Sequence, residues 1–181
     1  MYEVELKFPL GDPDAFVRRL AACGARPGPA FHQADLYFNH PSRDFGKTDE
    51  AFRIRSVDDR ACVTYKGPVV DSQTKTRREI EVALTGDGAR DQFAEVLKLL
   101  GFRPVREVRK RRQTYSLNWQ GREFEIALDA VEELGVFAEI ETLADEAGRP
   151  AAVTSILELV SQFQLPPAQP KSYLSLLLAK G

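Results

Sequence analysis

The chain has 181 residues, and its 25 Lys and Arg nearly balance its 27 Asp and Glu. This length supports one sizeable core, which predicts a single domain over residues 1–181. The near-neutral charge gives no general electrostatic attraction for nucleic acid. No apolar run approaches the roughly 20 residues that cross a bilayer. Neither nucleic acid nor a membrane is therefore expected as a partner.

The residue types that most often build zinc sites and disulfides are scarce. Cys23 and Cys62 lack the spacing of a disulfide framework or a metal site. With His32 and His40 as the two histidines, a histidine-based metal cluster is excluded. The chain opens directly on a strand pattern, without a basic leader and apolar segment, which predicts a cytoplasmic protein. Any chemistry is expected to use carboxylates, cations and a metal.

The sequence predicts an α+β fold with a mostly antiparallel sheet. Strands are expected at 2–8, 33–39, 51–57, 61–67, 75–84, 106–118, 122–129 and 136–142. Helices are expected from the Asp12-Pro13 cap to Gly24, from an Asp87 cap to Gly101 with Phe93, Val96, Leu97 and Leu100 as the apolar stripe, over 150–164, and over 172–179 behind a Ser172 cap. Asn118–Gly121 is expected to form a hairpin turn.

Several short motifs recur at a nearly constant spacing. E-V-E at 3–5 is matched by E-I-E at 79–81, and G-A-R-P at 24–27 by G-F-R-P at 101–104. Such similarity predicts two related halves, about 1–75 and 76–150, followed by C-terminal helices. Chance similarity is the alternative, because helix–glycine junctions are common. Two four-stranded halves would supply eight strands, which can close into a small barrel.

Charged residues of both signs occupy one face of nearly every predicted strand. In the first strand, Glu3, Glu5 and Lys7 alternate with large apolar residues. The other strands contribute Arg53, Arg55, Lys66, Arg77, Glu79, Glu81, Lys110, Arg112, Asp129, Glu139 and Glu141. Any one such strand is more often the solvated face of an antiparallel sheet. The joint pattern favours an enclosed interior lined by ions.

An enclosed set of carboxylates requires a cation. Two glutamates about 7 Å apart on one strand face, such as Glu3 and Glu5, repel each other by roughly 2 kcal/mol at an effective dielectric near 20. Oxygen-only ligands favour Mg²⁺ or Mn²⁺. The facing arginines and lysines suit phosphate oxygens. A triphosphate small molecule is the expected partner, because phosphoryl transfer uses metal-bound carboxylates opposite cations.

These motifs resemble the CYTH family, also called triphosphate tunnel metalloenzymes. The resemblance rests on E-x-E-x-K at 3–7, R-I-R at 53–55, Y-K-G-P at 65–68, R-x-E-x-E at 77–81, K-x-R at 110–112, Asp129, F-A-E-I-E at 137–141 and K-S-Y at 171–173. It implies an eight-stranded antiparallel closed β-barrel, which forms a tunnel with the charges inside and the helices packed outside.

The resemblance also implies roles for individual residues. Metal ligands would be Glu3, Glu5, Glu139 and Glu141, with Asp129 supporting or joining them. The triphosphate would be held by Lys7, Arg53, Arg55, Lys66, Arg77, Lys110, Arg112 and Lys171. Glu79 and Glu81 would hold these cations or contact a second metal. Alternation with Glu79 favours Arg77 over Arg78 as the residue that faces the tunnel.

The length and the L-G-V-F-A-E-I-E stretch at 134–141 resemble the class IV adenylate cyclases and their close relatives. Such an enzyme converts ATP to cyclic AMP and pyrophosphate. A triphosphatase acting on inorganic, thiamine or nucleoside triphosphate is the first alternative. A non-catalytic module that binds polyphosphate or nucleotides is the second. The resemblance also implies a homodimer.

Overall fold

The computed structural model describes residues 2–70 and 77–180. The strands are β1 (Tyr2–Pro9), β2 (Arg26–Asn39), β3 (Ala51–Val57), β4 (Arg60–Lys66), β5 (Arg77–Leu84), β6 (Arg103–Trp119), β7 (Arg122–Val131) and β8 (Gly135–Ala144). The helices are α1 (Pro13–Ala22), α2 (Phe45–Thr48), α3 (Ala89–Leu99), α4 (Arg149–Gln162) and α5 (Tyr173–Leu178). None of these helices has the length and apolar character that crossing a membrane would require.

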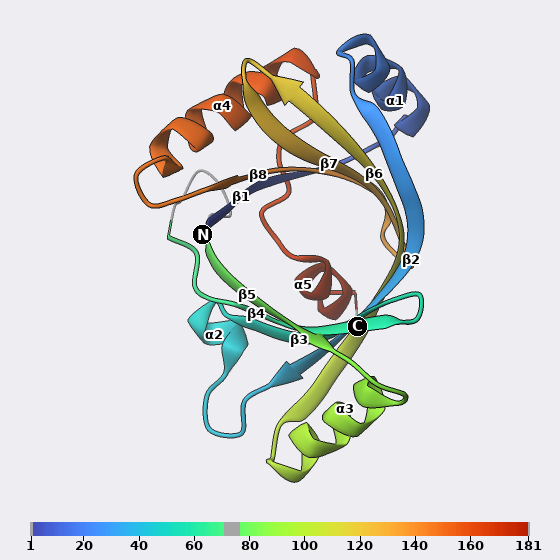
Figure 1. Cartoon of the computed structure of the whole chain (residues 1–181), viewed down its shortest axis with the longest axis vertical. Helices are drawn as coiled ribbons and strands as arrows, with labels where there is room; N and C mark the ends of the chain where they lie inside the picture. Colours follow the sequence, from blue (N-terminus) through green and yellow to red (C-terminus); the bar gives the residue numbers. More distant parts are fainter. Residues whose placement is uncertain (1, 71–76, 181) are drawn as a thin grey trace.

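The strands form one closed barrel in the order β1-β5-β4-β3-β2-β6-β7-β8, with every neighbouring pair antiparallel. Figure 1 shows the strands as a ring in projection. The predicted eight-stranded antiparallel barrel is confirmed. Because strands alternate their faces, closure turns one face of each strand toward a common interior.

The barrel order maps onto itself when the first four strands are exchanged with the last four. Exchanging β1 with β5, β2 with β6, β3 with β7 and β4 with β8 reproduces the same ring of neighbours. This arrangement is what two related halves would produce. The duplication itself stays a prediction, and its expected boundary near residue 75 lies outside the described residues.

Apolar side chains on the outer face of β1, β7 and β8 are covered by two helices. Phe16 and Leu20 of α1, Ile156 and Leu159 of α4, and Phe163 directly after α4 pack against the strand residues Val4, Leu6, Phe124, Ile126, Ala138 and Ile140. Burial of this much apolar surface is the main stabilising contribution to the fold. In Figure 1, α4 and α1 lie outside the ring, as predicted.

The third covering helix, α3, contacts the barrel along a narrower stripe than predicted. Ala94 and Leu97 pack on Phe38 and Ile54. The prediction was wrong for two residues of the apolar stripe, because Val96 is 47% exposed and Leu100 is 64% exposed. Only one side of the helix meets the strands, so these neighbouring positions face outward.

Most of the helix caps and turns predicted from the sequence are present in the structure. Asp12 caps α1 and Ser172 caps α5 through their side chains. Gln120 and Gly121 form the β6–β7 hairpin with positive φ angles of 52° and 79°, as the primed two-residue turns require. The Asp87 cap was wrong, because α3 is preceded by Gly88 in the left-handed region, without a side-chain cap.

β2 is the element whose length the sequence predicted least well. It begins at Arg26, whereas the prediction began at residue 33. Pro27 and Pro29 argued against a strand because proline cannot donate to a ladder. The structure accommodates them with a register shift between Pro27 and Ala30 in the pairing with β6. Strand pairing with the long β6 therefore prevails over the local signal.

The last helix lies across one opening of the barrel. In Figure 1, α5 falls inside the ring of strands. Its Tyr173 and Leu177 are buried against inward residues that include Tyr37, Val108 and Phe137. The sequence predicted helices outside the barrel, and α5 departs from this because its apolar residues pack on the tunnel wall. Apolar side chains therefore close this part of the barrel interior.

Two neighbouring residues of α4 allow a direct test of its cover on the barrel. Ile156→Ala should lower the free energy of unfolding by roughly 2–5 kcal/mol, because Ile156 is 0% exposed and its truncation leaves a cavity. Leu157→Ala is the control, because Leu157 is 40% exposed. Chemical denaturation measures both, and equal losses would contradict the packing of α4 described above.

Candidate active site

The barrel encloses a cavity of about 880 Å³. It is lined by charged residues from β1, β3, β4, β5, β6 and β8 and from the segment before α5. Of the residues singled out in the sequence, it is lined by Glu3, Glu5, Lys7, Arg53, Arg55, Lys66, Arg77, Glu79, Glu81, Lys110, Arg112, Glu139, Glu141 and Lys171. The alternation in the sequence therefore predicted that the strand residues of this set line one interior, and Lys171, implied by the resemblance, lines it from the segment before α5.

Three carboxylates converge on one wall of this cavity. Glu3, Glu5 and Glu141 each offer an oxygen, and these oxygens lie within 4.8 Å of one another. Antiparallel pairing of β1 with β8 sets Glu5 opposite Glu141. Burial and the charges of Glu3 and Glu5 raise the pKa of Glu141 to about 8. These three residues are called the acidic group below.

The acidic group has the chemistry of a divalent-metal site. Its oxygen ligands suit a hard cation such as Mg²⁺ or Mn²⁺. Burial, followed by the charges of Glu3 and Glu5, disfavours the ionised form of Glu141 and raises its pKa, and the mutual repulsion of the three carboxylates is part of this cost. A bound cation would remove that repulsion, so these residues fit a metal.

Asp129 lies outside the acidic group and binds cations of the protein itself. Its side chain is 0% exposed and accepts hydrogen bonds from Lys110 Nζ at 2.7 Å, Arg112 Nε at 2.7 Å and Tyr173 Oη at 3.0 Å. Glu139 accepts a hydrogen bond from the same guanidinium. The structure therefore pairs Asp129 and Glu139 with the cations and places Glu3, Glu5 and Glu141 together.

A second buried carboxylate organises the opposite wall. Asp35 accepts hydrogen bonds from Arg53 Nη1 at 3.1 Å and, in a bidentate pair, from Arg55 Nε at 2.8 Å and Nη2 at 3.0 Å. Burial opposes its ionisation, but the two guanidinium groups hold its pKa well below the usual range. Arg53 also donates to Tyr37 Oη at 3.1 Å.

The remaining cations occupy distinct positions. Lys66 bridges Glu3 and Glu79, with its Nζ 2.8 Å from an oxygen of each. Burial opposes its charged form, yet the pKa of Lys66 is raised because Glu3 and Glu79 lie beside it. Arg77 is 3.6 Å from the Asp49 carboxylate. Lys171 is exposed and lies on the rim of the cavity.

Tyr173 connects α5 to the ionic interior. The Lys7 ammonium lies 4.2 Å from the centroid of its ring, and that of Lys110 lies 5.1 Å away. Burial and the neighbouring charges of Glu139 and Asp129 raise the pKa of its hydroxyl. The neutral hydroxyl can therefore donate to Asp129 while the ring faces two cations.

Sequence reasoning missed Asp35, Tyr37 and Tyr173 as parts of this interior. Asp35 and Tyr37 had a usable signal, since both alternate with Leu36 and Phe38 on a predicted strand. Tyr173 ends the K-S-Y motif at 171–173, but its place inside the barrel had no signal, because helical spacing does not reveal that a helix enters a barrel mouth.

The sequence model of the CYTH domain matches residues 1–173. The chain belongs to the CYTH domain family. A protein from Methanocaldococcus jannaschii is 36% identical over 166 residues, which cover 91% of each chain. Adenylate cyclase CyaB of Aeromonas hydrophila is 30% identical over 172 residues, covering 93% of this chain and 83% of that protein. A solved structure from Pyrococcus horikoshii has a TM-score of 0.87 and 38% identity, with 99% of each chain covered.

Ionisation of the acidic group should make stability depend on pH. Glu141 has a usual pKa of 4.5 and a folded pKa of about 8. Its contribution to stability is therefore fully present below pH 4.5 and is lost as the pH rises through 8. Glu141→Gln cannot ionise, so its melting temperature relative to wild type should increase between pH 5 and pH 8.5 in the presence of a chelator. The control is Glu158→Gln at an exposed position of α4, and a difference independent of pH for Glu141→Gln would refute the assignment.

Removal of the charge at Asp35 should strongly destabilise the fold. Asp35→Asn leaves the Arg53 and Arg55 guanidiniums without their shared anion, which should cost roughly 3–5 kcal/mol of unfolding free energy. Asp49→Asn is the matched control, because its partner Arg77 is 3.6 Å away and Asp49 is 62% exposed; its loss should stay below about 1 kcal/mol. Similar denaturation midpoints for the two variants would count against the stabilising role of Asp35.

Proposed function

We propose that this protein is a divalent-metal-dependent enzyme that acts on a triphosphate, as an adenylate cyclase converting ATP to cyclic AMP and pyrophosphate. The observation that carries the proposal is the acidic group beside a row of cations within one cavity. The three carboxylates of the acidic group lie within 4.8 Å of one another and are largely withdrawn from solvent, so their joint ionisation calls for a cation. The CyaB relative, named an adenylate cyclase, supports the choice of reaction.

The cations supply the means to bind the phosphate chain. Lys7 on β1, Lys110 and Arg112 on β6, and Arg53 and Arg55 on β3 all line the same cavity. Asp129 and Asp35 fix the orientation of four of these groups through hydrogen bonds. Their guanidinium and ammonium donors would bind phosphate oxygens and stabilise the negative charge of the departing pyrophosphate.

One donor on this wall has no partner in the described part of the chain. The Nε atom of Arg53 is buried and lacks a hydrogen-bond acceptor among the described residues. A buried N–H without an acceptor is costly. An oxygen of a bound phosphate would satisfy it, which supports an anionic ligand in this cavity.

The acidic group would hold the metal, through Glu3, Glu5 and Glu141. A bound divalent ion supplies Lewis-acid polarisation of a phosphoryl oxygen and lowers the pKa of a coordinated hydroxyl. Glu139 and Asp129, expected from the sequence as ligands or supports, are assigned to positioning Arg112 and Lys110. Glu79 positions Lys66, and Glu81 lies at the cavity edge near Thr64.

Triphosphate hydrolysis is the second candidate, because the same cavity can serve it. If the phosphate chain is reversed, the γ-phosphoryl group lies at the acidic group and water is the nucleophile. A non-catalytic phosphate binder is the third candidate, and the convergence of Glu3, Glu5 and Glu141 argues against it, since anion binding needs cations alone. The cytoplasmic location and the homodimer expected from the sequence stay predictions.

The test is to identify products from ATP, tripolyphosphate and thiamine triphosphate with Mg²⁺ or Mn²⁺. Cyclic AMP with pyrophosphate supports the cyclase, orthophosphate supports the triphosphatase, and tight binding without turnover supports the binder. Glu5→Gln should reduce turnover by at least about 100-fold, because it removes a metal ligand. Glu158→Gln, on the exposed face of α4, is the control. Near wild-type turnover of a folded Glu5→Gln variant would overturn the metal-site assignment.

A further inference from the structure

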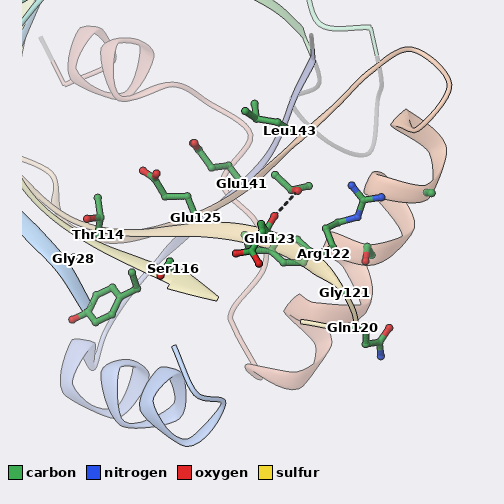
Figure 2. A pocket seen from close by; sticks show the side chains of 15 residues that line it. Gly28, Thr114, Ser116, Gln120, Gly121, Arg122, Glu123, Glu125, Glu141 and Leu143 are labelled. Carbon is green, nitrogen blue, oxygen red and sulfur yellow. Dashed lines mark hydrogen bonds between the residues drawn. The ribbon is translucent and has the colours of Figure 1, made fainter. Parts of the chain in front are cut away.

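The two seams of β1 differ greatly in length. Among the described residues, β1 pairs with β5 at only two positions, and the last of them sets Tyr2 opposite Arg78. On its other side, all eight residues of β1 lie opposite β8. β8 is in turn fully paired with β7, and Figure 2 shows their Glu141 and Glu125 side by side. The barrel is therefore closed weakly at one place, between β1 and β5.

Most of β5 extends past β1 and presents an open strand edge. The Gly67 N–H donates a hydrogen bond to the Arg78 carbonyl at 2.9 Å, so the backbone groups of Arg78 face β4. Backbone groups alternate between the two edges of a strand, which turns those of Glu79, Glu81 and Ala83 away from β4. Within residues 2–70 and 77–180, no strand lies opposite them on that side. In Figure 1, β5 accordingly diverges from β1 on its way to α3.

The outer face of this part of β5 is apolar and uncovered. Ile80 is 44% exposed and Val82 is 58% exposed. They lie beside Tyr65 and Val63 of β4, and none of the four belongs to the apolar clusters found in the described part of the chain. Residues 79–84 also contain no lysine, proline or register shift, the devices that usually keep an edge strand from associating. These residues are called the open edge below.

The open edge is complementary to itself in one antiparallel register. When Val82 of two chains meet across a twofold axis, Glu81 lies opposite Ala83 of the second chain. Glu81 and Ala83 can then exchange backbone hydrogen bonds, because their N–H and C=O groups face this edge. The two Val82 side chains form a non-hydrogen-bonded pair, in which side chains are closest. Ile80 lies opposite Leu84, so the apolar residues of both chains join on one face.

The neighbouring registers are less favourable. A register centred on Glu81 sets two carboxylates directly opposite each other, and a register centred on Ile80 sets Glu79 opposite Glu81. A register centred on Ala83 leaves Ile80 opposite Gly86, beyond the end of β5. Charge and length therefore both select the register centred on Val82.

We propose that the open edge is the interface of a homodimer, in which β5 of one chain pairs antiparallel with β5 of a second copy about a twofold axis at Val82. The same surface is used by both chains, as a closed twofold contact requires. Pairing covers Ile80 and Val82 and leaves Glu79 and Glu81 facing the cavity of their own barrel. The proposal gives the homodimer implied by the resemblance a defined interface, and it is independent of the reaction that the cavity performs.

A disulfide can report this register directly. In a Cys23→Ser, Cys62→Ser background, Val82→Cys places two thiols across the axis with their Cα atoms about 4.5 Å apart, which a disulfide can span. Ile80→Cys is the matched control, because it faces the same side but lies four residues, or about 13 Å, from its own copy along the strands. Under mild oxidation, Val82→Cys should form a covalent dimer at least about tenfold faster than Ile80→Cys.

Sedimentation equilibrium of the full chain measures the association itself. Val82→Lys sets two ammonium groups opposite each other and should raise the dimer dissociation constant by at least about tenfold. Ala83→Pro removes a donor of the open edge while preserving the ladder with β4, and it should weaken the dimer likewise. Leu157→Lys, at a 40% exposed apolar position of α4, is the control and should change nothing. Melting curves confirm that each variant is folded.

A wild-type chain that stays monomeric at every concentration would overturn the proposal. So would a dimer of unchanged affinity in a folded Val82→Lys or Ala83→Pro variant, or equal rates of cross-linking for the two cysteine variants. Growth into open-ended aggregates would also contradict it, because a twofold contact closes on itself. A dimer that fails to turn over any triphosphate would count against the proposed function and leave the interface intact.

Discussion

The interior of this barrel depends on two buried carboxylates that each hold several cations. Asp35 and Asp129 are 2% and 0% exposed and bind Arg53, Arg55, Lys110 and Arg112. Without these anions, four positive charges would be enclosed in a space of low polarisability at a prohibitive cost. The hydrogen bonds to Asp35 and Asp129 therefore hold these four cationic side chains in fixed orientations. An anionic substrate would meet hydrogen-bond donors that are already oriented.

Asp35 and Asp129 lie on strands that do not correspond when the two halves of the barrel are exchanged. In the first half, the acid is on β2 and its cations are on β3. In the second half, the cations are on β6 and the acid is on β7. The corresponding strand pairs thus carry the same type of ion pair with the signs exchanged. The acidic group lies on β1 and β8, so the barrel has an acidic region on that side although its strand order is symmetric.

The inward-facing set could be predicted from the sequence because it follows from a period of two, whereas closure of the sheet into a barrel was implied by the resemblance of the motifs to the CYTH family. Alternation along β1 separates Glu3 and Glu5 from Val4 without reference to any other strand. The partners of Asp129 could not be predicted in this way, because they depend on the register that sets Arg112 opposite it. The outward position of Val96 depends on the rotation of α3 about its own axis as it packs on the strands. The entry of α5 into the barrel depends on the space that the inward-facing side chains leave.

The pairing of the first strand with the last has a consequence for synthesis of the chain. Glu5 meets Glu141 across β1 and β8, and Tyr173 reaches Asp129 from the final helix. During translation, β1 can pair with β5 first, but its pairing with β8 must wait until more than a hundred further residues have emerged. A ribosome that stops before β8 releases a polypeptide with the E-x-E-x-K motif but with no acidic group, and with one long edge of β1 open to association with other chains.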